Sequence, residues 1–93
     1  MTGTRYCINP DSAWRQIGAA VFVYSADGAF HRLRTPTAVD LFGALVERPC
    51  EIAELTDLLV ARYQVEPERA CADATAFVGA LVERKVAVEV ADE

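Results

Sequence analysis

The pattern of hydrophobic and polar residues changes its period near residue 35. Before that point, apolar residues gather in short alternating or continuous runs, at residues 13–17, 20–25 and 29–34. Gly18 separates the first two runs, and Asp27-Gly28 lies between the last two, where it is a strong hairpin signal. The pattern therefore predicts three short antiparallel strands joined by two tight turns.

After residue 35 the apolar residues recur with the period of an amphipathic helix, about 3.6 residues. The first predicted helix lies between Thr35 and Pro49, the second covers about residues 52–63, and the third runs from about Pro67 or Glu68 to Arg84. Thr37 and Asp40 resemble a capping box at the start of the first helix, with Asp in place of Glu, and Pro36 can pre-set the entry. Pro49 ends this helix. Residues 86–90 alternate again and predict a short final strand, and residues 91–93 are expected to fray.

This order of elements predicts one α+β domain over residues 1–93, with a core between about residues 6 and 90. A three-stranded antiparallel sheet followed by three helices also suits a winged-helix-like arrangement. Hydrophobic residues make up 53% of the chain, which is enough for a packed core. Trp14, Leu33 and Phe42 are expected to belong to that core.

The charge of the chain weighs against several partners. Its formal net charge is −5, which argues against nucleic acid and anionic membrane surfaces, since both are bound through basic residues. The longest apolar run, residues 19–24, is far shorter than the roughly 20 residues that span a bilayer. The N-terminal sequence contains no apolar segment of a secretion signal, so the cytoplasm is the expected location.

Residues suited to catalysis or metal binding are sparse. The chain has one histidine, His31, and three cysteines that are far apart and form no Cys-x-x-Cys motif. We expect a packed or solvated His31 rather than a base, and small buried or half-buried thiols rather than a reactive one. Gly43 and Gly79 fall inside helical patterns, where close helix packing is the simplest explanation. No cofactor, metal or catalytic residue is expected, and the chain is not predicted to be an enzyme.

The third predicted strand, residues 29–34, is a candidate binding edge. A strand at a sheet edge carries unpaired N–H and C=O groups, which a peptide can complete as a further strand. Alternation places Phe30, Arg32 and Arg34 on one face and His31 and Leu33 on the other. The two arginines suit an acidic peptide, but charged side chains on an edge also protect against aggregation.

Two other functions remain open from the pattern alone. The helices over residues 51–84 invite comparison with a winged-helix DNA-binding regulator, although acidic and basic residues are balanced along the third helix. A free strand edge can also pair with a second copy of the chain, which makes a homodimer the third alternative.

Several segments resemble corresponding parts of one known family. They are residues 8–15 (INPDSAWR), 30–33 and 37–42 (FHRL and TAVDLF), 51–55 and 62–68 (EIAEL and RYQVEPE), and 73–78 and 81–84 (DATAFV and LVER). Their order and spacing resemble the PqqD-like family, the peptide-recognition domains (RiPP recognition elements) of ribosomally made, modified peptides. The resemblance extends over about residues 6–90.

The resemblance implies a winged-helix-like domain that performs no chemistry and acts as a peptide chaperone. In the family, the leader segment of a precursor peptide adds as an antiparallel strand to the third strand, in a groove beside the third helix. The domain then delivers the peptide to a tailoring enzyme, often a radical SAM protein. This chain is thus expected to act in natural product biosynthesis, without nucleic acid or membrane partners.

Carried over by position, the resemblance implies a binding site with two sides. The strand side is Ala29, Phe30, His31, Arg32, Leu33 and Arg34, and the helix side is drawn from Asp73, Ala76, Phe77, Ala80, Leu81 and Arg84. Phe77 and Leu81 also suit the core. The family often has glycine where Lys85 stands, and an extra residue appears between Leu33 and Thr37. The resemblance therefore leaves two neighbouring positions for the end of the binding strand. A shift of the strand pairing by one residue exchanges the faces of all its side chains.

Overall fold

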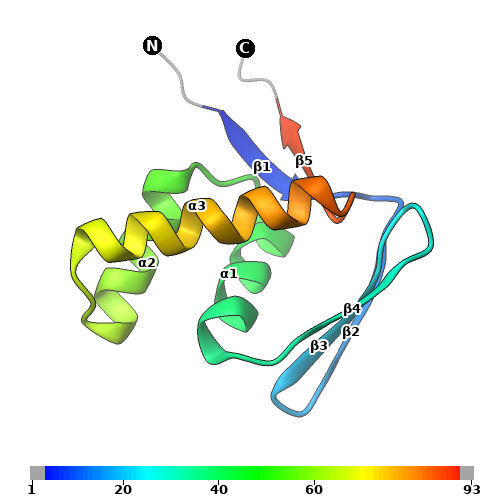
Figure 1. Cartoon of the computed structure of the whole chain (residues 1–93), viewed down its shortest axis with the longest axis horizontal. Helices are drawn as coiled ribbons and strands as arrows, with labels where there is room; N and C mark the ends of the chain where they lie inside the picture. Colours follow the sequence, from blue (N-terminus) through cyan, green and yellow to red (C-terminus); the bar gives the residue numbers. More distant parts are fainter. Residues whose placement is uncertain (1–3, 91–93) are drawn as a thin grey trace.

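The computed structural model describes residues 4–90, so the expected fraying of residues 91–93 lies outside the described residues. The elements follow in the order β1 (Arg5–Ile8), β2 (Ala13–Ile17), β3 (Ala20–Tyr24), β4 (Phe30–Leu33), α1 (Pro36–Glu47), α2 (Ile52–Tyr63), α3 (Pro67–Glu83) and β5 (Ala87–Val90) (Figure 1). The predicted α+β class, with three antiparallel strands before three helices, is confirmed, as is the final strand. Within residues 4–90, none of the helices combines the length and the apolar character of a membrane span.

The strand β1 was not predicted. It pairs antiparallel with β5, so that the two ends of the chain form a separate two-stranded sheet. On its other side, the backbone of Tyr6 exchanges two hydrogen bonds with that of Cys50, at 2.8 and 2.9 Å. This short strand therefore links the C-terminal strand to the segment that joins α1 and α2.

The larger sheet has the strand order β2-β3-β4 and is antiparallel throughout. Its inner face supplies Val21, Val23 and Leu33 to the core, where they are at most 8% exposed. The helices supply most of the other large buried side chains, which include Phe42, Leu45, Leu55, Leu59 and Leu81. Leu33 and Phe42 are therefore core residues, as expected.

The expectation that Trp14 belongs to the core is wrong, because Trp14 is 44% exposed. Trp14 lies on β2, an edge strand of the sheet, where it is paired with Val23 of β3. One side of the indole therefore meets solvent. Its ring still packs edge-on against Phe42, with ring centroids 5.4 Å apart.

The first helix begins earlier than the capping-box pattern indicated. The N-cap is Thr35, whose Oγ1 accepts a hydrogen bond from the backbone N–H of Ala38 at 3.2 Å, and Pro36 is the first helical residue. Proline restricts the residue before it to extended conformations, and Thr35 has such a backbone, with φ −80° and ψ 145°. The prediction of Thr37 as the cap is therefore wrong.

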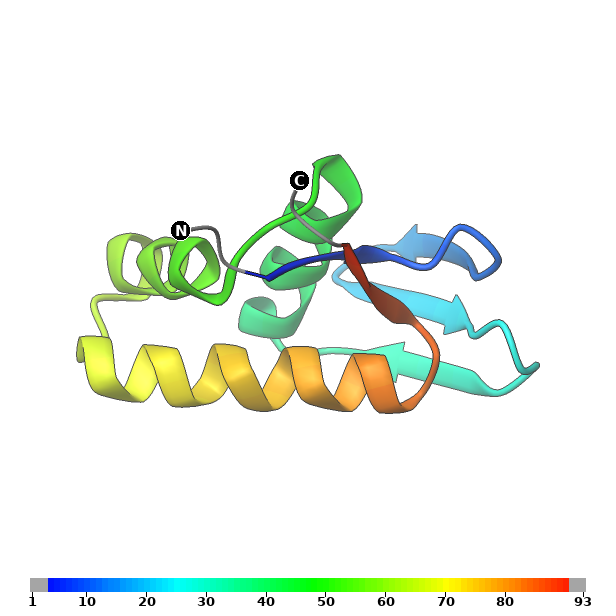
Figure 2. The same cartoon turned by 90° about the horizontal axis from the view of Figure 1, so that it is seen from above.

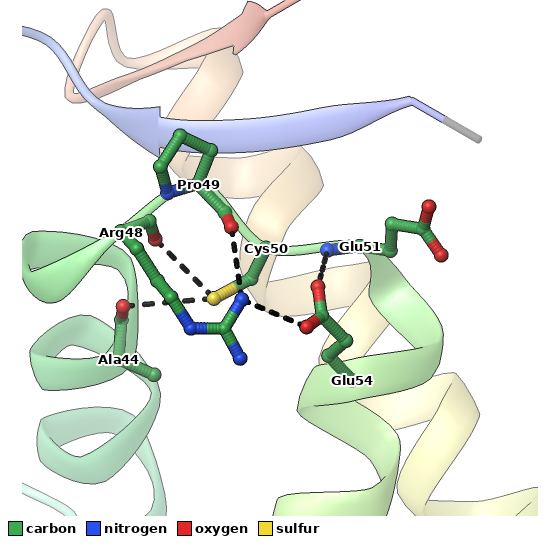
Figure 3. A network of polar contacts seen from close by, with 6 residues as sticks. All are labelled: Ala44, Arg48, Pro49, Cys50, Glu51 and Glu54. Atoms are coloured by element: carbon green, nitrogen blue, oxygen red, sulfur yellow. Dashed lines mark hydrogen bonds and ion pairs between the residues drawn. The ribbon is translucent and has the colours of Figure 1, made fainter. Parts of the chain in front are cut away.

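A network of polar contacts closes the junction between α1 and α2 (Figure 3). The carboxylate of Glu54 accepts the backbone N–H of Glu51 at 2.8 Å and forms an ion pair with Arg48, also at 2.8 Å. The buried Cys50 thiol lies against the backbone carbonyls of Ala44 and Arg48, at 3.6 and 3.3 Å. These contacts satisfy groups at the end of one helix and at the start of the next.

The third helix ends in a Schellman motif at Lys85. The N–H of Lys85 donates to the carbonyl of Val82, and the N–H of Val86 donates to that of Leu81. Lys85 has a φ of 64°, the left-handed conformation that glycine adopts most easily. The helix therefore ends where the family resemblance placed a glycine, although lysine occupies the position here.

The expectation of close helix packing at Gly43 and Gly79 is also wrong. A Cβ atom built on Gly43 or Gly79 would meet no atom of another element within 4 Å. Both residues are exposed. Close helix packing therefore explains neither of them, and the structure offers no other reason for glycine there.

Candidate functional site

The strand β4 forms an edge of the larger sheet and pairs only with β3 among the residues described. The sheet has a second edge at β2. Figure 2 shows β4 on the side of the sheet where α3 lies, and β2 on the opposite side. A helix therefore lies toward each edge: α3 on the side of β4, and α1 on the side of β2, where Trp14 packs on Phe42 and Gln16 shares a cavity with α1 residues.

The register of β3 and β4 determines which backbone groups of β4 face outward. The N–H of Ser25 donates to the carbonyl of Ala29 at 2.8 Å, so these two residues form a hydrogen-bonded pair. Hydrogen-bonded pairs alternate along an antiparallel ladder. With the observed pairing, His31 and Leu33 direct their backbone groups toward β3, and Phe30 and Arg32 direct theirs toward the open edge.

The same alternation applies to the opposite edge. Because Val21 and Val23 bond toward β4, the residues between them in β3 bond toward β2. Their partners in β2 are Ala13, Arg15 and Ile17. Trp14 and Gln16 consequently direct their backbone groups outward from the β2 edge.

Ala29, the first residue expected on the strand side, belongs to the turn and not to β4. Its N–H lies within hydrogen-bond distance of Ser25 Oγ, at 3.1 Å, and Asp27 Oδ1, at 3.2 Å. The Ser25 hydroxyl also donates to the Asp27 carboxylate, and these contacts lower the pKa of Asp27. The backbone groups of Ala29 are thus used within the hairpin.

The outer face of the sheet is unusually apolar for an exposed surface. Ile17, Tyr24 and Phe30 are 57, 56 and 52% exposed. Phe30 stacks on Phe22 with centroids 5.9 Å apart and lies 5.0 Å from the ring of Tyr24. A shallow cavity of about 460 Å³ lies over this face, along β2 and the aromatic residues. Exposed apolar clusters of this kind commonly mark interaction surfaces.

The inner side of β4 faces the core. Leu33 is buried, and His31 lies in the same cross-strand row as Val23 and Trp14. The Nε2 atom of His31 is buried and has no hydrogen-bond partner among residues 4–90. His31 is therefore a packed side chain, which agrees with the expectation from the sequence.

Three of the helix-side residues meet in one cavity of about 210 Å³ beside the end of β4. Asp73, Ala76 and Phe77 line it from α3, and Thr35, Thr37, Ala38, Leu41 and Leu59 line the rest. Phe77 is partly buried and packs on the core, while Asp73 is exposed and lies 3.9 Å from Arg69. The cavity is mostly apolar with one carboxylate at its rim.

The remaining expected residues lie elsewhere. Leu81 is 2% exposed and belongs to the core. Ala80 is half-buried, and Arg84 is the exposed C-cap of α3. Arg34 follows the end of β4 and is not paired in the sheet. The alternating sizes of residues 21–24 (Val-Phe-Val-Tyr) are the sequence signal that could have revealed the outer aromatic face.

A family model described as "Coenzyme PQQ synthesis protein D (PqqD)" matches residues 19–87 of the chain. The chain belongs to the PqqD family. The match includes the whole of β3, β4 and the three helices, and so covers both sides of the candidate site in this PqqD-family chain. The resemblance seen in the sequence is thereby confirmed.

Two solved structures have the same fold. One is described as "Lasso peptide synthetase B1 complexed with the leader peptide", with 23% identity, a TM-score of 0.76, and coverage of 89% of this chain and 96% of that one. The other is "TbiB1 in Complex with the TbiA(beta) Leader Peptide", with 21% identity, a TM-score of 0.81, and coverage of 92 and 99%. No curated protein gives a significant match.

Within residues 4–90 of this PqqD-family chain, no group of three or more His, Cys, Asp or Glu side chains is placed to bind a metal ion. Cys7 is half-buried, Cys50 is buried and Cys71 is exposed. The expectation of buried or half-buried thiols therefore holds for the first two and is wrong for Cys71. Burial raises the pKa of the Cys50 thiol.

Proposed function

We propose that this chain is a non-catalytic adaptor that binds the leader segment of a ribosomally made precursor peptide. The leader adds to the sheet as a strand beside β4, and the adaptor presents it to a modifying enzyme. Membership of the PqqD family supports this function over a winged-helix DNA-binding regulator. The net charge of −5 supports it too, because binding to phosphates requires excess basic residues.

The observation that carries the proposal is the open edge of β4 at Phe30 and Arg32. Their N–H and C=O groups face outward on the side of the sheet where α3 lies. A guest strand gains ladder hydrogen bonds there whatever its sequence. Selectivity among peptides then comes from pockets for alternate side chains of the guest.

The cavity at Asp73, Ala76 and Phe77 is suited to one such side chain. It lies just beyond the C-terminal end of β4, where an antiparallel guest strand begins to pair. A strand that extends along β4 places an inward side chain near this cavity, since alternate side chains point to the side of the helices. The apolar lining favours an aliphatic or aromatic residue at that position.

The two solved relatives support the proposal because each is described with a leader peptide. We infer that the partner of this chain is likewise a leader peptide, made in the cytoplasm by the ribosome. The modifying enzyme that receives it, for example a radical SAM protein, is a further part of the proposal. A homodimer formed through a free edge competes with the guest strand, and peptide-free sedimentation at several concentrations distinguishes the two.

The test is a titration of isotope-labelled protein with the synthetic leader of a short precursor encoded near its gene. We expect the largest backbone amide shifts at residues 30–33 and 73–77, with an affinity on the order of micromolar to nanomolar. Weak dependence on salt is expected as well, in contrast to phosphate binding. Shifts confined to β2 or to the β1–β5 sheet would contradict the proposal.

A further inference from the structure

We propose that the β4 edge selects guest strands with a carboxylate opposite Arg32 and an apolar side chain opposite Phe30. The guest then carries the pattern acidic–x–apolar within its paired segment. This inference rests on the proposed function and specifies the class of peptide that binds. It follows from Phe30 and Arg32, because each presents both its backbone groups and its side chain to a guest strand.

Phe30 and Arg32 present both kinds of group to a guest. Their backbone groups face the open edge, as the register requires. Their side chains point to the outer face, since Phe30 lies beside Tyr24 and Arg32 beside Phe22, both in cross-strand register. A guest residue that is hydrogen-bonded to either one places its own side chain beside that residue on the same face.

The guest position opposite Arg32 favours a carboxylate. Arg32 forms no ion pair with any residue in the described range 4–90. No acidic residue shares its face, which consists of Ala13, Arg15, Ile17, Ala20, Phe22, Tyr24, Phe30 and Arg32. In a chain with 14 acidic residues, this sheet face is positively charged, and a guest carboxylate is its natural complement.

The guest position opposite Phe30 favours an apolar side chain. Phe30 is 52% exposed and extends the row of Ala13 and Tyr24 to the edge of the sheet. An aliphatic or aromatic guest residue covers the exposed side of its ring. Cross-strand pairs of aromatic and aliphatic residues are favourable in sheets.

The order of the two residues follows from strand direction. The sheet is antiparallel throughout, and antiparallel pairing is the more common arrangement. An antiparallel guest meets Arg32 before Phe30, so the carboxylate precedes the apolar residue with one residue between them. The middle residue points to the inner side of β4, together with His31.

The test selects binders from a random linear peptide library displayed on phage, with the whole protein as bait. Peptides that shift the amides of Phe30 and Arg32 are expected to share the acidic–x–apolar pattern. Replacement of their carboxylate by lysine should weaken binding roughly three- to tenfold. Selection against Arg32→Glu should instead enrich lysine or arginine at that position.

Arg15→Glu is the matched control. Arg15 lies in the same cross-strand row and on the same face, but on the opposite edge strand β2. It should enrich the same peptides as the unmodified protein. Peptides that bind at β4 without a charge preference, or with one that Arg32→Glu leaves unchanged, would overturn the inference alone. Failure to obtain any peptide that binds at β4 would overturn the proposed function as well.

Discussion

The indole ring of Trp14 packs edge-on against the phenyl ring of Phe42, with centroids 5.4 Å apart and ring planes at 76°. Trp14 comes from β2 and Phe42 from α1, so the contact joins the sheet to the helices. Phe42 is 1% exposed, whereas Trp14 is 44% exposed. The half-exposed tryptophan thus covers a fully buried core residue at the border of the sheet.

Trp14→Ala should destabilise the fold by about 1–2 kcal/mol, because it removes an aromatic pair and uncovers Phe42. Urea unfolding followed by far-UV circular dichroism measures the effect. Ile17→Ala on the same strand is the control, since Ile17 is 57% exposed and should cost less. Equal losses in the two variants would show that the contact with Phe42 contributes nothing specific.

The Glu54 carboxylate should make stability depend on pH. Its contacts with the Glu51 N–H and with Arg48 lower the pKa of Glu54 below 4.5. The contribution is therefore complete above about pH 4.5 and is lost as pH falls through the lower, folded-state value. Glu54→Gln keeps an acceptor for the backbone and removes the charge.

The measurement compares urea midpoints of the unmodified protein and Glu54→Gln between about pH 6 and pH 3. The difference between them should shrink as the solution becomes acidic. A constant difference over this range would show that the charge of Glu54 has no role at the α1–α2 junction.

The three cysteines should react with iodoacetamide in the order of their exposure. Cys71 is exposed and should be modified first, Cys7 is half-buried, and Cys50 is buried with a raised pKa. A buried thiol with a raised pKa has little reactive thiolate at neutral pH. Mass spectrometry after short pulses, with and without urea, gives the order. Early modification of Cys50 in the folded protein would contradict its position in Figure 3.

Gly79→Ala should stabilise the protein by about 0.5–1 kcal/mol, because Gly79 lies within α3 and a Cβ there meets open space. Gly18→Ala is the matched control. Its Cβ also meets open space, but Gly18 has a φ of 61°, which alanine disfavours, so the variant should lose stability. Thermal unfolding of both variants measures the two signs. Destabilisation by Gly79→Ala would contradict the open space that the structure shows around Gly79.

Much of the fold was predictable because its signals are local. The change from alternation to helical periodicity and the Asp27-Gly28 turn located β2 to β4 and the helices. The strand β1 escaped because it is four residues long and its partner lies at the other end of the chain. The cap at Thr35 escaped because the capping-box pattern favoured Thr37, whereas Pro36 is itself the first helical residue and Thr35 precedes it.

For the candidate site, the sequence predicted which way the β4 side chains face but not which α3 side chains face the core. Alternation placed Phe30 and Arg32 on one face of β4, and the register bears this out. On α3, residues at helical spacing face either the core or the surface, and only the packing around Leu81 and Phe77 separates them. The alternation at residues 21–24 indicates an aromatic outer face on β3, but the contacts of Phe22 and Tyr24 with Phe30 form only when β3 and β4 pair.

The central claim is that a guest strand completes the open edge of β4. Arg32→Pro tests it most directly, because proline removes an outward N–H and leaves the bonds between β3 and β4 in place. Gln16→Pro removes an outward N–H from the opposite edge and is the matched control. Isothermal titration of each folded variant with the leader peptide should show binding lost in Arg32→Pro and retained in Gln16→Pro. Full affinity in a folded Arg32→Pro variant would contradict the account.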